Sequence, residues 1–234
     1  MTALKVTSPK LNVFRYFDLI LGFSVAILII SNIVAVKLIS FGPIITDGGA
    51  IIFPLSYILG DILTEVYGYS YARRAIWASF GFMILAVIVF KLVELMPSAA
   101  EWTNQSSYQA ILGFVPRIVL ASLCAYILGQ FMNSFVLAKL KILSGGKSLW
   151  FRLVSSTAIG ELVDTTVFAL IAFSGLLHGF VMIKYILIGW IFKVVVEIVM
   201  LPISYKVIGF LKKSEHVDKY DYDTNFSPFH IKVG

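Results

Sequence analysis

The chain has 234 residues, 59% of them hydrophobic, and a mean hydropathy of +0.91, which excludes an ordinary soluble domain and indicates an integral membrane protein. A membrane-spanning helix needs roughly 20 apolar residues, so the length suffices for about six spans and leaves no room for a soluble catalytic domain. The net charge of +6 is typical of basic loops that set membrane topology, and we expect no nucleic-acid partner.

Six apolar runs follow one another along the chain, and each predicts a membrane-spanning helix. They are Phe17–Ser40, Gly48–Tyr67, Ala75–Met96, Phe114–Ala138, Trp150–Leu177 and Tyr185–Lys206. We therefore predict an all-α fold, that of a polytopic membrane protein whose six-helix domain covers residues 17–206. Residues 1–16 are predicted to be a cytoplasmic N-terminal segment, and residues 207–234 a soluble cytoplasmic tail.

The segments that connect the runs carry their basic residues mainly on one side. That side has Lys5, Lys10, Arg15, Arg73, Arg74, Lys139, Lys141, Lys147, Arg152, Lys206, Lys212 and Lys213. The opposite side has Asp47, Glu94, Glu101 and His178, with only Lys91 and Lys184 near its edges. Because basic loops stay in the cytoplasm, this asymmetry predicts that both termini are cytoplasmic.

Two outer segments have turn or interfacial character. Asp47-Gly48-Gly49 is a turn sequence that can open a helix. Ser98–Leu112 is polar but includes Trp102 and Tyr108, which fits a short interfacial helix; an ordinary external loop is the alternative.

The second run contains two carboxylates, Asp61 and Glu65, four residues apart and so on one helix face. Asp61 lies roughly 20 Å from the outer end of the run at 1.5 Å per residue. We expect Glu65 to pair with Arg73 or Arg74 in the following hairpin. Asp61 has no such neighbour, and the sequence leaves open whether it ties helices together or binds a ligand.

The fifth run places Glu161 and Asp164 close to the middle of the membrane, ~14 and ~18 Å from its inner edge. They share a helix face that Thr157 and Phe168 extend. A charge at this depth costs at least ~2.5–3.5 kcal/mol. Such carboxylates must meet cations, take up protons or accept several hydrogen bonds, so we predict a binding site here.

The sixth run carries Lys193 and Glu197 at i and i+4. The two side chains either neutralise each other, or Lys193 serves the carboxylates of the fifth run. Asn32 in the first run and Asn133 in the fourth either join helices by hydrogen bonds or contribute to the site. The predicted substrate-binding residues are Asp61, Glu161, Asp164, Lys193, Glu197, Asn32, Asn133, Tyr57 and Phe168.

The chemistry of these residues favours an organic solute. Carboxylates bind groups rich in N–H donors, such as an ammonium or a guanine-like edge. Nearby aromatic rings, among them Tyr57 and Phe168, suit a planar heterocycle. Hydrolase, zinc and nucleotide-binding motifs do not occur in the sequence, and Cys124 is its single cysteine. We therefore predict no enzyme activity, no metal site and no cofactor.

Three stretches resemble the queuosine-precursor transporter family, which is also grouped with vitamin uptake transporters. They are Phe53–Trp77 (with Phe53-Pro54-Leu55-Ser56-Tyr57, Asp61, Thr64–Tyr69 and Ala72-Arg73-Arg74), Ser156–Phe168, and Lys193 through Glu197 to Pro202. The tail sequence Asp223–Phe229 is also similar to the ending of many members. The resemblance covers nearly all of the chain from the first run onward.

This resemblance implies a bacterial inner-membrane importer of 7-cyano- or 7-aminomethyl-7-deazaguanine, which supply the modified base queuosine of transfer RNA. It also implies a six-helix fold like that of the substrate-binding components of energy-coupling-factor vitamin transporters. Two alternatives stay open: a vitamin-binding subunit that needs a separate ATPase module, and a non-transporting membrane assembly protein. The driving force and any oligomer also stay open.

Overall fold

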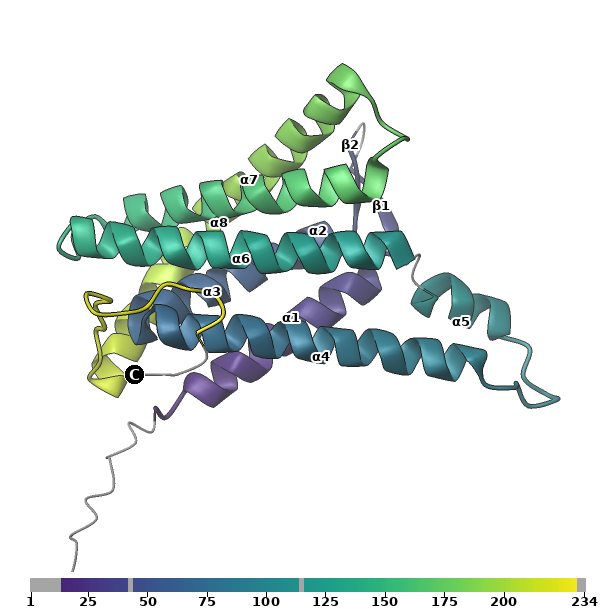
Figure 1. Ribbon diagram of the computed structural model, residues 1–234, viewed down its shortest axis with the longest axis horizontal. Coiled ribbons are helices and arrows are strands. Elements are labelled where there is room, and N and C mark those ends of the chain that lie inside the picture. Colours follow the sequence, from purple (N-terminus) through teal and green to yellow (C-terminus); the bar gives the residue numbers. More distant parts are fainter. Residues whose placement is uncertain (1–13, 42–43, 114–115, 231–234) are drawn as a thin grey trace, which may run out of the picture.

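The computed structural model describes residues 14–41, 44–113 and 116–230, and most of the predicted N-terminal segment 1–16 lies outside them (Figure 1). Helices dominate the described chain. The elements are α1 (Phe17–Val34), β1 (Leu38–Phe41), β2 (Ile44–Asp47), α2 (Gly49–Ile52), α3 (Pro54–Tyr67), α4 (Tyr69–Leu95), α5 (Gln105–Leu112), α6 (Pro116–Leu143), α7 (Leu149–Phe173) and α8 (Gly179–Glu215).

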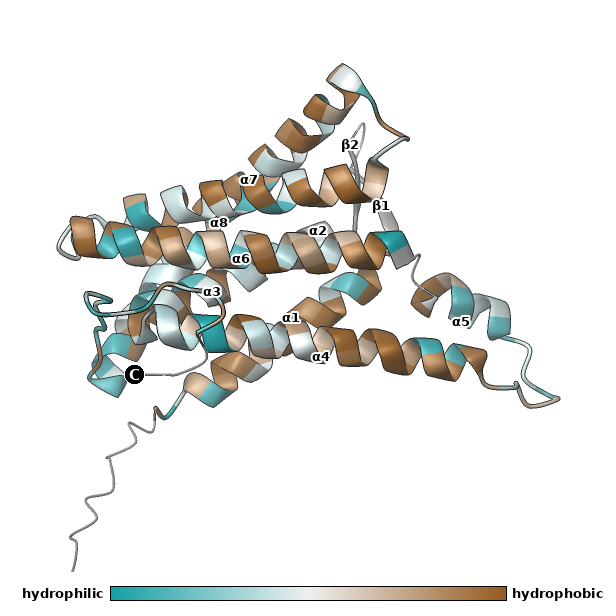
Figure 2. Ribbon diagram, viewed as in Figure 1, coloured by the Kyte–Doolittle hydropathy of each residue, from teal (hydrophilic) through white to brown (hydrophobic). Residues whose placement is uncertain are grey.

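Among the described residues, five helical stretches are long and apolar enough to cross a membrane: α1, α4, the stretch 105–143 that contains α6, α7 and α8. Their outward surfaces are rich in apolar side chains, and Figure 2 shows hydrophobic colouring along most of their length. The chain is thus a polytopic membrane protein. The predicted second run forms α2 and α3; α3 alone has 14 residues, roughly 21 Å at 1.5 Å per residue, against a hydrocarbon core of ~30 Å.

The predicted outer end of the first span, Ser40, is wrong. Helix α1 ends at Val34, and the apolar residues that follow pair as the antiparallel hairpin β1–β2, with Leu38 opposite Asp47. Ile39 in β1 and Ile44 and Ile45 in β2 are β-branched, which favours a strand over a helix once the α1 ladder has ended. The N–H of Gly48 donates to the carbonyl oxygen of Lys37 over 2.9 Å and closes the hairpin base. Helix α2 begins at Gly49, as the turn sequence predicts.

The predicted helix in the outer segment between the third and fourth runs is present. It is α5, an eight-residue helix that lies beside the far end of α4, away from the bundle (Figure 1). The hydroxyl of Tyr108 donates to the carbonyl oxygen of Phe90 in α4, which holds α5 against that helix. We call this end of the molecule, which also has the β1–β2 hairpin, the hairpin end.

Helices α6 and α7 run side by side (Figure 1), and two facing glycines allow their close approach. A Cβ atom on Gly160 would lie 2.9 Å from the carbonyl oxygen of Gly129 and 2.7 Å from the Cβ of Asn133. A Cβ on Gly129 would lie 2.8 Å from the Cβ of Asp164. Small residues let membrane helices pack backbone to backbone. At this contact Gly160 of α7 lies level with Asn133 of α6, and Gly129 of α6 lies level with Asp164 of α7.

The segment after α8 folds back on the bundle rather than extending away from it. Helix α8 continues to Glu215, so the expected tail boundary at residue 206 falls inside this helix. Beyond it, the Asp221 carboxylate accepts hydrogen bonds from the first backbone N–H of α4, that of Tyr69, at 3.0 and 3.1 Å. Figure 1 shows this tail, in yellow, crossing the beginning of α4. We call this the tail end of the molecule.

Side chains of α4 hold the tail through its carbonyl oxygens. Arg73 donates to Asn225 at 2.7 Å and to Ser227 at 2.9 Å, while the Trp77 indole donates to Pro228 at 2.8 Å. The prediction that Glu65 pairs with Arg73 or Arg74 is wrong, because neither arginine is among its partners in the described salt bridges. The Arg73 guanidinium instead faces the tail.

Glu65 lies fully buried at the tail end among cations from three other helices. Arg152 of α7 holds both of its oxygens, at 2.5 and 3.1 Å, and Lys212 of α8 lies 2.6 Å away. Lys141 of α6 is 3.5 Å away and also bonds Asp218 of the tail. We call Glu65, Lys141, Arg152, Lys212 and Asp218 the tail-end ion cluster. It joins α3, α6, α7, α8 and the tail.

Candidate functional site

A second group of charges lies midway along the bundle, where α3, α7 and α8 meet. Asp61, Glu161, Asp164 and Glu197 are each at most 4% exposed, and Lys193 lies among them. We call these five residues the mid-bundle cluster. Four carboxylates and one ammonium in an apolar bundle are an unusual arrangement, because each charge removed from water needs a partner.

Lys193 reaches across from α8 to α7. Its Nζ lies 2.8 Å from Oε2 of Glu161 and 2.6 Å from Oδ2 of Asp164. The sequence allows Lys193 to pair either with Glu197 or with the carboxylates of α7. In the described salt bridges it pairs with the carboxylates of α7. The ammonium also lies 4.8 Å from the centre of the Phe53 ring, a cation–π distance.

Asp61 is held by hydrogen bonds from two helices. The Asn133 amide of α6 donates to Oδ1 at 2.7 Å, and the Thr157 hydroxyl of α7 donates to Oδ2 at 3.3 Å. One turn earlier on α3, the fully buried Tyr57 donates from its hydroxyl to the carbonyl oxygen of Gly160 at 3.3 Å. Asp61 and Tyr57 thus join α3 to the α6–α7 pair, beside the carboxylates of α7.

Several buried acceptors near these residues have no hydrogen-bond donor among the residues that the structure describes. They are both oxygens of Glu197, Oε1 of Glu161, and the side-chain carbonyl oxygens of Gln130 and Asn133. A buried polar atom left without a partner costs about 1–3 kcal/mol. Acceptors of this kind are suited to a ligand that brings N–H donors, or to protons.

Two predicted residues do not join the cluster through the described contacts. The Asn32 amide donates to the carbonyl oxygen of Leu28 within α1, at 2.8 Å. Phe168 is half-buried one turn beyond Asp164, and its ring packs on Phe173 with 5.9 Å between centres. That Asn32 and Phe168 contact a substrate stays a prediction.

Two residues of the site, Gln130 and Phe53, were missed or given little weight. Gln130 lies one turn before Asn133 on α6, and its amide donates to the Ser56 hydroxyl at 3.0 Å. The spacing of Gln130 and Asn133, three apart in an apolar helix, is a signal that could have found the first of them. Phe53, which faces Lys193, is not distinguishable in sequence from an aromatic residue at the membrane interface.

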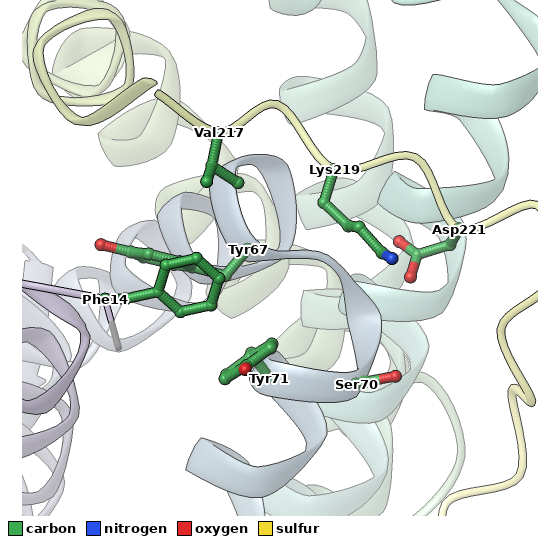
Figure 3. Close-up of a pocket in the computed structure, with 7 residues that line it drawn as sticks. All are labelled: Phe14, Tyr67, Ser70, Tyr71, Val217, Lys219 and Asp221. Atoms are coloured by element: carbon green, nitrogen blue, oxygen red, sulfur yellow. The ribbon is translucent and has the colours of Figure 1, made fainter. Parts of the chain in front are cut away.

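Two cavities lie at the tail end, and neither is lined by the mid-bundle cluster. One, of about 110 Å³, has aromatic rings on one side and the ends of Lys219 and Asp221 on the other (Figure 3). The second, of about 230 Å³, lies between α4 and the tail and is lined by Arg73 and Asn225 among others.

Residues 47–207 match the protein family described as putative vitamin uptake transporter. The chain belongs to this family. The match runs through α3, α4, α6, α7 and most of α8 and includes every residue of the mid-bundle cluster. Asn32 and the tail lie outside it.

Three curated bacterial proteins are also similar to the chain, each with 29% identity. The Bacillus subtilis (strain 168) relative, named probable queuosine precursor transporter, aligns over 75% of this chain and 77% of its own length. The Escherichia coli K12 relative, named queuosine precursor transporter, aligns over 70% and 72%. The Haemophilus influenzae (Rd) relative, named probable queuosine precursor transporter, aligns over 68% and 67%. No solved structure matches the chain.

These matches confirm the family resemblance that the sequence motifs indicate. They also confirm that the chain is a member of a transporter family and not of an enzyme family.

Proposed function

We propose that the protein imports queuosine precursors, the 7-deazaguanines that carry a cyano or aminomethyl group, across a bacterial inner membrane. The names of the three relatives support this substrate class. The observation that carries the proposal is the mid-bundle cluster, with its buried carboxylates and unpaired acceptor oxygens. The family match disfavours the alternative of a non-transporting assembly protein.

The proposal includes six membrane crossings with both termini in the cytoplasm. Five are the long apolar helices, and the sixth is α2 with α3, which lead from the β1–β2 hairpin toward the tail end. The basic residues Lys141, Arg152 and Lys212 gather at the tail end, as expected for a cytoplasmic side. A six-helix arrangement like that of energy-coupling-factor substrate-binding components remains part of this proposal.

A deazaguanine offers two parallel donors, N1–H and the 2-amino group, which one carboxylate can accept together. We assign this contact to Glu161. Lys193 lies 2.8 Å from Oε2 of Glu161, but Oε1 of Glu161 has no described hydrogen-bond donor, and Asp164 already accepts a hydrogen bond from Lys193 at 2.6 Å. The rings of Tyr57 and Phe53, which pack on each other with 5.9 Å between centres, would lie against one flat face of the substrate.

The test is uptake of labelled 7-deazaguanines by cells that make no queuosine precursor and express this chain. Glu161→Gln and Asp164→Asn remove one charge each with little change of shape, and both should abolish uptake while the protein still inserts. Glu101→Gln, in the exposed outer loop, is the matched control and should transport normally. Full uptake by both site variants would contradict the proposed site.

The same cells decide whether the chain works alone. If it is an independent importer, it should restore uptake in a host that lacks any energy-coupling-factor ATPase. If it is a vitamin-binding subunit, uptake should require that ATPase module as well.

A further inference from the structure

Glu197 of α8 is a buried carboxylate that the proposed contacts leave unused. It is 1% exposed, and both of its oxygens lack a hydrogen-bond donor within the described part of the chain. Lys193, one turn earlier on the same helix, would be its natural partner, yet the described salt bridges of Lys193 are with Glu161 and Asp164. Glu197 is therefore a buried acceptor without a cation among the described salt bridges.

The charge balance around Glu197 is negative. It lies close enough to Glu161 and Asp61 for their negative charges to repel its own. The single ammonium of the mid-bundle cluster is engaged by α7, and Asp61 is held by neutral donors, Asn133 and Thr157. An added positive charge beside Glu197 would offset this repulsion.

We infer that Glu197 binds the ammonium group of the substrate, so that this transporter favours 7-aminomethyl-7-deazaguanine over neutral 7-deazaguanines. This inference rests on the proposed function. Glu161 on α7 takes the guanine-like edge, and Glu197 on the facing helix takes the charged substituent at the other end of the molecule. A cyano group has no donor to offer Glu197 and leaves the carboxylate unpaired.

Three substrates separate charge from size: the 7-aminomethyl compound, the 7-hydroxymethyl compound, which has nearly the same shape without the charge, and the 7-cyano compound. The ammonium can form an ion pair with Glu197, whereas the neutral hydroxymethyl group can only donate a hydrogen bond, so wild-type uptake should prefer aminomethyl to hydroxymethyl by about tenfold or more in kcat/KM. This comparison needs no variant. A ratio near one would overturn the inference.

Glu197→Gln removes the charge and keeps the shape. It should lower aminomethyl uptake about tenfold or more and change cyano uptake less than about threefold. Glu197→Asp keeps the charge and should retain the preference for the aminomethyl compound. Ser204→Ala is the control, because Ser204 is buried on the same helix and its hydroxyl bonds only the Met200 carbonyl oxygen among the described contacts.

The outcomes distinguish the two proposals. If the wild-type chain imports none of the three compounds, the proposed function fails. If it imports them but Glu197→Gln lowers all three equally, Glu197 has a structural or proton-carrying role and the inference is wrong. Selective loss of the aminomethyl compound supports it.

Discussion

Lys193 of α8 donates a hydrogen bond to Asp164 of α7 over 2.6 Å, although Glu197 lies one turn away on its own helix. The same ammonium is 2.8 Å from Glu161. One cation thus links two carboxylates of the facing helix and leaves a third carboxylate for other partners. This arrangement underlies both the proposed substrate site and its proposed preference for a cation.

Replacing Lys193 should destabilise the protein as well as stop transport. In Lys193→Met, Glu161 and Asp164 lose their shared cation, and breaking a buried ion pair costs about 3–5 kcal/mol. We expect a lower thermal midpoint in detergent and no uptake. Adding Asp164→Asn should recover part of the stability, because one unpaired charge is removed. An unchanged midpoint in Lys193→Met would contradict the described ion pairs.

The close contact of α6 and α7 should not tolerate a side chain at Gly160. In Gly160→Ala, the new methyl group meets Asn133 and the backbone of Gly129, so we expect a loss of about 1–3 kcal/mol and reduced uptake. Gly81→Ala on α4 is the matched control, since a Cβ there has no neighbour within 4 Å. Equal stability of the two variants would show that α6 and α7 are not so closely packed.

Asp221 should keep the tail attached to the bundle. In Asp221→Ala the first N–H of α4 loses its acceptor, which typically costs about 1 kcal/mol for a helix cap. We expect trypsin to cleave after Lys219 faster in this variant than in wild type. Asp223→Ala is the control. If both variants are cleaved at the wild-type rate, the tail is not held by Asp221.

The tail-end ion cluster should weaken in acid through Asp218. Partial burial alone would raise the pKa of Asp218, but hydrogen bonds from Lys141 and Lys212 lower it below its usual value. A carboxylate with a lowered folded-state pKa adds stability above its ordinary pKa, and this stability is lost as pH falls through the folded-state value.

Asp218→Asn should therefore be less stable than wild type at pH 7. The difference should begin to shrink as pH falls through the ordinary pKa of Asp, about 3.9, and disappear only below the lower folded-state pKa. Thermal midpoints in detergent across this pH range give the measurement. A constant difference at every pH would mean that the Asp218 charge does not act as described.

Hydrophobic runs predicted α4, α6, α7 and α8 because length and composition suffice for a helix that faces lipid. They did not predict the β1–β2 hairpin, since a four-residue strand at the end of an apolar run and a second one just beyond it have no separate signal. Spacing along one helix brought Glu161 and Asp164 together correctly. Partners far apart in the chain could not be chosen this way: Glu65 pairs with Arg152 and Lys212, 87 and 147 residues away.

The most direct test of the mid-bundle site is binding of 7-deazaguanines to the purified protein, with guanine as comparator. The account predicts that wild type binds the 7-aminomethyl compound, that Glu161→Gln loses this binding, and that Glu101→Gln keeps it. Undiminished binding by a folded Glu161→Gln variant would contradict the claim that the mid-bundle carboxylates hold the substrate.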